Sequence, residues 1–236
     1  METFKYEIHC HTSEASKCGK MPASELARLY KSLGYTGIIV TDHFFNGNCA
    51  IPNDIPWKER LDLFFRGFEN AREEGAKIGL DVFCGWEYNY RATEFLTYGL
   101  EPEWLYDKPQ VMDVGPDEYC ALVRNDGGFI VHAHPFRERS YIRYFRLLPY
   151  CTDAVEVCNA AHHQFPQFDR RAKDYAASYN LPELAGSDTH FPWQTGYCCV
   201  ELPERISGTD GFVSLVREKR HRNLRLDGSG NTVGVI

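Results

Sequence analysis

Histidines and carboxylates gather in five short clusters along the chain. His9 and His11 stand two residues apart. Residues at that spacing on a strand point to the same side, so the pair can bind one ion. Imidazole and carboxylate together are the donors that proteins offer to Zn²⁺, Mn²⁺ or Fe²⁺. One H-x-H pair is a weak signal, but five clusters behind five separate apolar runs predict a metal site rather than coincidental polar loops. The other four clusters are Asp42 with His43, Glu87, His132 with His134, and Asp188 with His190.

The cysteines indicate what kind of metal site this is. The chain has nine of them, and none forms a C-x-x-C pair. That pattern disfavours a closed thiolate site and favours an open, catalytic one. Because nine is an odd number, we expect free thiols in a reducing compartment rather than a disulfide framework.

Short apolar runs alternate with helical patterns and would carry these clusters. Strands alternating with helices predict βα units and a mainly parallel sheet, and about seven strands without a linker favour a closed barrel. In such barrels the chemistry lies at the carboxyl ends of the strands, where the clusters fall. Segment 99–115, rich in Pro, Glu and Asp, is expected to be a long loop. The expected strands are 4–10, 36–41, 81–86, 94–99, 128–132, 153–158, 183–186 and 197–201, and the expected helices are 22–33, 57–77, 116–125, 164–179 and 210–219.

Bulk properties exclude some partners. The chain has 236 residues, 43% of them hydrophobic, and a formal net charge of −7. A negative balance argues against binding to a nucleic-acid duplex or an anionic membrane, because both attract a basic face. No apolar run approaches the roughly 20 residues that cross a bilayer, and the first residues lack the pattern of a signal peptide. We therefore expect a cytoplasmic protein.

The clusters also carry a resemblance to a known family. The sequence resembles the PHP domain family, named for polymerase and histidinol phosphatase, and the motifs follow the family order over residues 4–205. The resemblance implies an α/β fold of the distorted (β/α)7, TIM-like barrel kind, as a single domain over residues 1–236 with a C-terminal helix region at 206–236. It also implies hydrolysis of phosphate esters. The motifs are IHCHT at 8–12, TDH at 41–43, GWE at 85–87, AHP at 133–135, VEVCN at 155–159 and GSDTH at 186–190.

The same resemblance implies a set of metal ligands. Two or three divalent ions (Mn, Fe or Zn) would lie at the mouth of the barrel. Their ligands would be His9, His11 and Asp188 for the first ion, His134 for the second, and His43 and His190 for the third, with Glu87 bridging the first two.

Two positions depart from the family pattern. Where the family often places Asp or His after H-x-H, the alignment puts Lys17. A protonated lysine is a poor ligand, so either Lys17 replaces the charge of a third ion or it is a surface residue. Where the family often supplies a histidine after the bridging acid, this chain has Glu94. Glu94 is either a ligand that favours Mn²⁺ or Fe²⁺ over Zn²⁺ or a solvated side chain.

Other polar residues follow the same strands. Arg137 and Arg139 come directly after AHP, and a guanidinium fork matches phosphate oxygens, so one of them could bind the substrate; the alternative is a surface arginine. His162 and His163 either reach the mouth of the site as an acid or ligand, or are exposed. His132 is expected to lie behind the ligands.

We expect a metal-dependent phosphoesterase acting on a small-molecule phosphomonoester or phosphodiester. A hydroxide bridging two ions would attack phosphorus, with Glu87, His190 and Arg137 as the catalytic residues. One alternative is a PHP fold that serves as a binding or regulatory module. Another is a metal hydrolase acting on a non-phosphate bond, because the site rather than the fold fixes the substrate.

Overall fold

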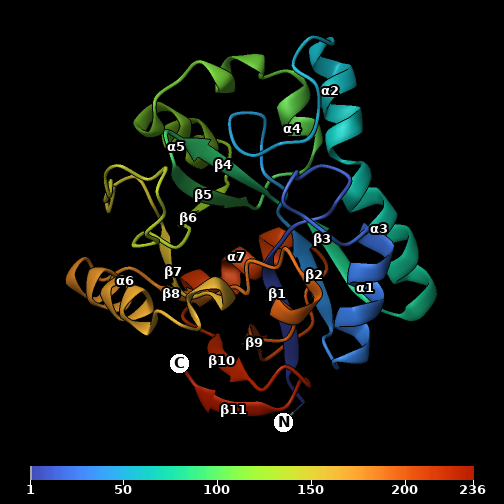
Figure 1. The fold of residues 1–236 in the computed structure, drawn as a ribbon, viewed down its shortest axis with the longest axis vertical. Coiled ribbons are helices and arrows are strands. Elements are labelled where there is room, and N and C mark those ends of the chain that lie inside the picture. Colours follow the sequence, from blue (N-terminus) through green and yellow to red (C-terminus); the bar gives the residue numbers. More distant parts are fainter. Residues whose placement is uncertain (1) are drawn as a thin grey trace.

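The computed structural model describes residues 2–236, which form two β-sheets with helices packed around them (Figure 1). The six-stranded sheet has the order β11 (Thr232–Val235), β10 (Arg222–Leu226), β9 (Cys198–Leu202), β1 (Phe4–Cys10), β2 (Gly37–Val40) and β3 (Asp81–Cys84). The five-stranded sheet has the order β4 (Trp86–Tyr90), β5 (Thr93–Tyr98), β6 (Phe129–His132), β7 (Ala154–Cys158) and β8 (Glu183–Ala185).

The helices surround both sheets. In Figure 1, α1 and α3 lie on one side of the molecule, beside β1 to β3, and α6 lies on the other side. The α-helices are α1 (Ala23–Ser32), α2 (Trp57–Phe64), α3 (Arg66–Ile78), α4 (Glu103–Tyr106), α5 (Pro116–Asn125), α6 (Pro166–Ser178) and α7 (Thr209–Arg217). Three short 3₁₀ helices are η1 (Pro109–Met112), η2 (Ala160–His162) and η3 (Pro192–Gln194). No helix of residues 2–236 is long and apolar enough to span a bilayer.

The predicted closed (β/α)7 barrel is wrong. Both sheets are mixed: β9 runs antiparallel to β1, and β5 runs antiparallel to β4 and β6. A short turn at Arg91 and Ala92 joins β4 to β5, and strands joined so closely form an antiparallel hairpin rather than a βα unit. Alternation along the sequence predicted eight of the eleven strands of residues 2–236. It missed β4, β10 and β11, and it did not predict the strand directions.

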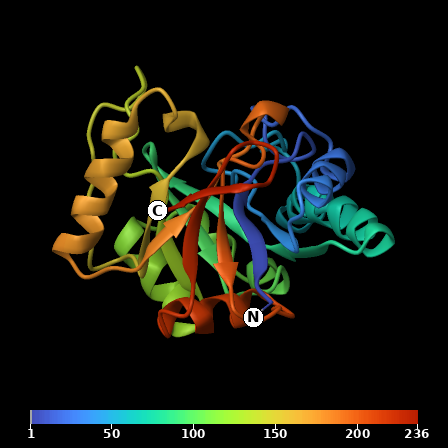
Figure 2. The same cartoon turned by 90° about the horizontal axis from the view of Figure 1, so that it is seen from below.

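The C-terminal segment and two other stretches also differ from expectation. Residues 206–236 contain α7, but they add β10 and β11 to the edge of the first sheet as well (Figure 2). The expected loop at 99–115 contains α4 and η1, and the single helix expected at 57–77 divides into α2 and α3 around Phe65.

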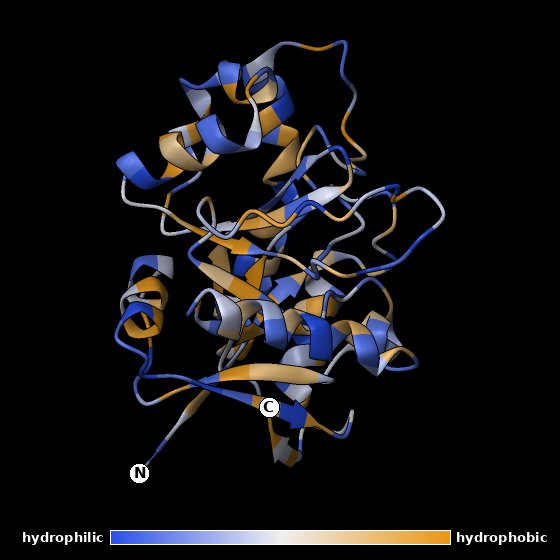
Figure 3. Ribbon diagram, turned by 90° about the vertical axis from the view of Figure 1, so that its left-hand side faces the viewer, coloured by the Kyte–Doolittle hydropathy of each residue, from blue (hydrophilic) through white to orange (hydrophobic). Residues whose placement is uncertain are grey.

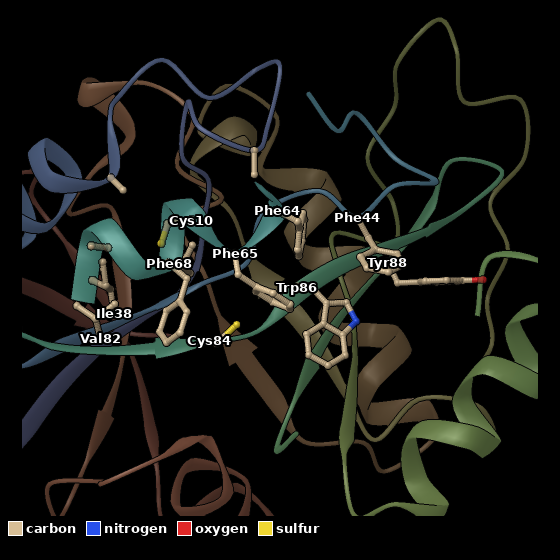
Figure 4. Close-up of a cluster of buried hydrophobic side chains, with 14 of the residues drawn as sticks. Cys10, Ile38, Phe44, Phe64, Phe65, Phe68, Val82, Cys84, Trp86 and Tyr88 are labelled. Atoms are coloured by element: carbon tan, nitrogen blue, oxygen red, sulfur yellow. The ribbon is translucent and has the colours of Figure 1, made fainter. Parts of the chain in front are cut away.

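Apolar side chains hold the helices on the sheets. In α1 the buried Leu26, Ala27 and Tyr30 share one face, and the helix ends before Gly34, whose φ of 77° suits a residue without a Cβ. β2 is buried along its whole length, as expected for a central parallel strand. Strands in the middle of the molecule are accordingly apolar, with polar residues outside (Figure 3). The cluster between α3 and the sheet includes Ile38, Phe64, Phe65, Phe68, Val82 and Cys84 (Figure 4).

The two sheets meet where the polar clusters lie. Two isolated parallel bridges join Cys10 to Thr189 and His43 to Glu87. They place the ends of β1 and β2 beside the segments that follow β8 and β3. The polar clusters are therefore brought together at the junction of two sheets, rather than at the mouth of a closed barrel.

Candidate metal centre

His9, His11 and Asp188 form one end of the centre. The backbone N–H of His11 donates to Thr189 O at 3.0 Å and that of Thr189 donates to His9 O at 3.2 Å, so the two segments are fastened side by side. The Nε2 atoms of His9 and His11 lie 3.2 Å apart. Asp188 Oδ1 lies 3.3 Å from the first and 3.1 Å from the second. All three residues are buried.

Glu87, on β4, lies in the middle of the histidines. Its Oε1 is 3.3 Å from His9 Nε2 and 3.2 Å from His134 Nε2. Its Oε2 is 3.7 Å from His11 Nε2 and 2.5 Å from His43 Nδ1. Burial raises the pKa of Glu87, but the charges of His43 and His9 and hydrogen bonds from His134 and His43 outweigh burial and hold that pKa well below its usual range. A carboxylate with a histidine pair on each oxygen has the arrangement of a bridging ligand.

Glu94 enters the centre from β5, the partner strand of β4. Its Oε2 is 3.6 Å from His134 Nε2 and its Oε1 is 3.9 Å from His43 Nδ1. The antiparallel pairing of Asn89 with Glu94 sets this position. The structure therefore places the Glu94 carboxylate among the predicted ligands, with its side chain 11% exposed.

The donor set fits divalent ions. Ligand atoms within 4.8 Å of one another form four groups of three among residues 2–236. Two of the atoms, His43 Nδ1 and Glu87 Oε2, are buried 2.5 Å apart and have no other hydrogen-bond partner, and burying such polar groups is costly unless an ion binds them. The groups are His11, His43 and His190; His9, His134 and Asp188; His9, His11 and Glu87; and His43, Glu87 and Glu94.

The backbone is strained at two of these residues. His134 has a φ of 28° and Asp188 has a φ of 52°. Residues with a side chain rarely adopt such angles, and they persist where the surrounding structure enforces them, commonly at functional sites. No sequence motif indicated this strain.

Glu156, on β7, orients two of the histidines. Its Oε1 lies 2.7 Å from His9 Nδ1, and its Oε2 accepts hydrogen bonds at 3.0 Å from the backbone N–H of His134 and from Asn159 Nδ2. A carboxylate on Nδ1 fixes the tautomer of His9 and leaves Nε2 free for an ion. Glu156 was not among the predicted site residues, although an acid within the apolar run VEVC was a usable signal.

Asp42 anchors the loop after β1. Its Oδ1 accepts from the backbone N–H of Thr12 at 2.7 Å and from Ser16 Oγ at 2.6 Å, and its Oδ2 accepts from Thr12 Oγ1 at 2.7 Å. Burial raises its pKa to about 6. Because both oxygens bind this loop, Asp42 positions the chain beside His43 and is not part of the ligand groups.

Of the two arginines that follow AHP, Arg137 lies in the site and Arg139 lies on the surface. Arg137 is 8% exposed, forms an ion pair with Asp188, and lies 3.4 Å from Asn159 Oδ1. It also lines a cavity of about 560 Å³ together with His43, Glu94, Tyr141 and His190. Arg139 is exposed and donates to the carbonyl of Glu138.

The remaining histidines lie around the centre. His190 lines the cavity, and its Nδ1 is 2.9 Å from Asp188 O. His132 is buried behind the ligands, where burial lowers its pKa to about 3. His162 is buried with Nδ1 2.7 Å from Asp169 Oδ1, whereas His163 is exposed.

Cys18, rather than Lys17, faces the histidines. Lys17 is exposed, and its backbone N–H donates to Asn48 O at 3.0 Å. Cys18 Sγ lies 3.1 Å from His43 Nε2 and lines the cavity. Burial raises the pKa of Cys18, but hydrogen bonds with His190 and His43 outweigh it and lower the pKa to about 6. Lys17 thus has the position of a surface residue, and the sequence motifs did not single out Cys18.

Comparisons with known proteins show which folds this chain resembles. Residues 166–221 match a family model described as PHP-associated. A two-domain protein from Bacteroides vulgatus containing a predicted PHP-like metal-dependent phosphoesterase has a TM-score of 0.69 and 18% identity; the match covers 95% of this chain and 65% of that one. PsfC from Pseudomonas syringae has a TM-score of 0.59 and 15% identity, covering 98% and 94%. An amidohydrolase from Chromobacterium violaceum with bound sulfate and no metal has a TM-score of 0.52 and 13% identity, covering 78% and 87%. No curated protein matches the sequence.

The matches define the class of the fold, an α/β fold that this chain shares with the three solved structures. At identities of 13% to 18% the likeness establishes the fold alone. The PHP-associated match over residues 166–221 agrees with the resemblance to the PHP family that the motif order predicts. The chain spans 65% of the length of the two-domain protein, so the activity of that whole protein is not carried over.

Proposed function

We propose that the chain is a metal-dependent phosphoesterase acting on a small-molecule phosphate ester. The observation that carries the proposal is Glu87, whose two oxygens each face a pair of histidines inside a buried centre. The fold shared with the two-domain protein that contains a predicted PHP-like metal-dependent phosphoesterase supports it. Divalent ions held there would supply Lewis acidity to a phosphoryl oxygen and to the attacking water.

The ligands would be the residues that the structure gathers. His9 presents Nε2 because Glu156 holds its Nδ1, and Asp188 and Glu87 supply negative charge that offsets the ions. We place the ligand set on His9, His11, His43, Glu87, Glu94, His134, Asp188 and His190.

Arg137 and His190 would act on the substrate. Arg137 stands at the wall of the cavity with a positive charge that can pair with phosphate oxygens. The contact of His190 Nδ1 with Asp188 O leaves Nε2 as the nitrogen that can hold a proton or an ion. With two ions bound, that nitrogen would protonate the leaving oxygen; with three ions, it would be a ligand instead.

A second candidate is a metal hydrolase acting on a carbon–nitrogen bond, since the fold is shared with an amidohydrolase. The same donors could serve either reaction. The third reading, a binding module without turnover, is less favoured because nearly every ligand position carries a donor.

The test uses protein stripped of metal by a chelator. We expect no hydrolysis of an aryl phosphate until Mn²⁺, Fe²⁺ or Zn²⁺ is added, and little hydrolysis of an aryl amide under the same conditions. Metal-dependent cleavage of the amide alone would favour the second candidate. Metal binding without turnover of either substrate would favour a binding module.

A further inference from the structure

We propose that Cys18 supplies a thiolate ligand to a third ion held with His43 and His190, and that this position prefers a soft ion such as Zn²⁺. The inference rests on the proposed function, because it takes the centre to bind metal. It replaces the expectation that Lys17 stands in for the third ion.

The cysteine lies against a ready group of imidazoles. Its Sγ is 3.1 Å from His43 Nε2. The ring of His11 stacks on those of His43 and His190, each at 4.3 Å between centroids, and one nitrogen from each of the three rings lies within 4.8 Å of the others. His43 is 5% exposed, and its Nδ1 faces Glu87 Oε2 at 2.5 Å, so its Nε2 is the nitrogen on the side of Cys18.

Backbone hydrogen bonds hold Cys18 at this place. On one side of it, the N–H of Lys17 donates to Asn48 O at 3.0 Å, and on the other the N–H of Lys20 donates to His190 O at 2.9 Å. Gly19 packs so closely that a Cβ there would lie 2.5 Å from Thr12 O. The loop is thus fastened to the segment that carries His190, and the thiol and the imidazoles are positioned together.

The metal position beside Cys18 would have a sulfur ligand, whereas the other metal positions have carboxylate ligands. Around one tetrahedral zinc, sulfur and nitrogen ligands lie roughly 3.3 to 3.6 Å apart, close to the observed contact of 3.1 Å. A thiolate favours soft ions, whereas carboxylates suit harder ones such as Mn²⁺. Glu87, Glu94 and Asp188 serve the other positions. The centre would therefore combine one soft position with harder neighbours.

Cobalt substitution tests the assignment without relying on turnover. Metal-free protein is titrated with Co²⁺, and the near-ultraviolet absorption that arises from charge transfer between sulfur and cobalt is followed, with bound metal counted in parallel. We expect the band in the unaltered protein and in Cys151→Ser, a control at a half-exposed cysteine that hydrogen bonds to Asp117.

Two Cys18 variants distinguish the loss of a metal ligand from the loss of the folded structure. Cys18→Ser should lose the absorption band and one bound ion. The Zn²⁺ affinity of that position should fall at least about 100-fold, because mutation of a residue that only hydrogen bonds to a ligand already lowers metal affinity 10- to 100-fold. Cys18→Asp should regain the ion without the band and bind Mn²⁺ better relative to Zn²⁺. Its recovery of the ion would show that the Ser variant lost a ligand rather than its fold.

Two results would overturn the inference. Cobalt binding without the sulfur band in the unaltered protein would exclude Cys18 as a ligand and leave the proposed metal centre standing. Failure of the folded, unaltered protein to bind Co²⁺, Zn²⁺ or Mn²⁺ at all would remove both the inference and the proposed function.

Discussion

Replacing Glu156 by glutamine should weaken metal binding through His9. In the structure one oxygen of Glu156 faces His9 Nδ1 at 2.7 Å, and the other accepts hydrogen bonds from the backbone N–H of His134 and from Asn159. A glutamine has one oxygen and one NH₂ group. The oxygen must face the two donors, so the NH₂ group must face His9 Nδ1.

That exchange reverses the tautomer of His9. Nδ1 would have to accept from the NH₂ group, and the proton would move to Nε2, the nitrogen that faces Glu87 and Asp188. A protonated Nε2 cannot bind an ion. Loss of such a supporting carboxylate typically costs 10- to 100-fold in metal affinity, which is about 1.4 to 2.7 kcal/mol.

The assay is competition with a chelator of known affinity, with circular dichroism to show that the variant is folded. Asp169→Asn is the matched control, because Asp169 contacts His162 at the same distance of 2.7 Å but supports none of the ligands. Unchanged metal affinity in Glu156→Gln, or an equal loss in Asp169→Asn, would refute the tautomer argument.

Three further predictions concern Glu87 in the metal centre, Gly186 beside it, and His132 on β6. Glu87→Gln should remove most turnover and at least one bound ion, because it removes a negative charge shared by four histidines; full activity with unchanged metal content would contradict the bridging role. Gly186→Ala should destabilise the fold and weaken metal binding, since the added Cβ would lie 2.6 Å from Glu156 Oε1 and 2.7 Å from His9 Cβ; a denaturation midpoint equal to that of the unaltered protein would disprove the tight packing. The pKa of His132 is about 3 when folded against 6.5 unfolded, so the unfolded state binds more protons between these values and stability falls as the pH drops through this window. From pH 6.5 to pH 5 the loss is about 2 kcal/mol, and it should be absent in His132→Phe; equal slopes of unfolding free energy against pH in the two proteins would rule it out.

The sequence determined which side chains could do chemistry. The two-residue spacing of His9 and His11 predicted that both side chains lie on one side of a strand. The apolar run before Glu87 predicted that this acid lies beside a strand, although Glu87 lies near the start of β4 rather than at a strand end. The motif order indicated the PHP resemblance. These features depend on local periodicity, which a linear sequence records.

Tertiary structure decided how those side chains meet. Strand direction depends on hydrogen bonds between distant segments, so the antiparallel pairing of β1 with β9, and with it the absence of the expected barrel, could not be predicted from alternation. The same holds within the centre. Glu156 supports His9 from 147 residues away, and Cys18 rather than its neighbour Lys17 faces His43 because backbone hydrogen bonds to Asn48 and His190 set the path of the loop. Contacts across such separations are determined by packing, and no spacing within one segment encodes them.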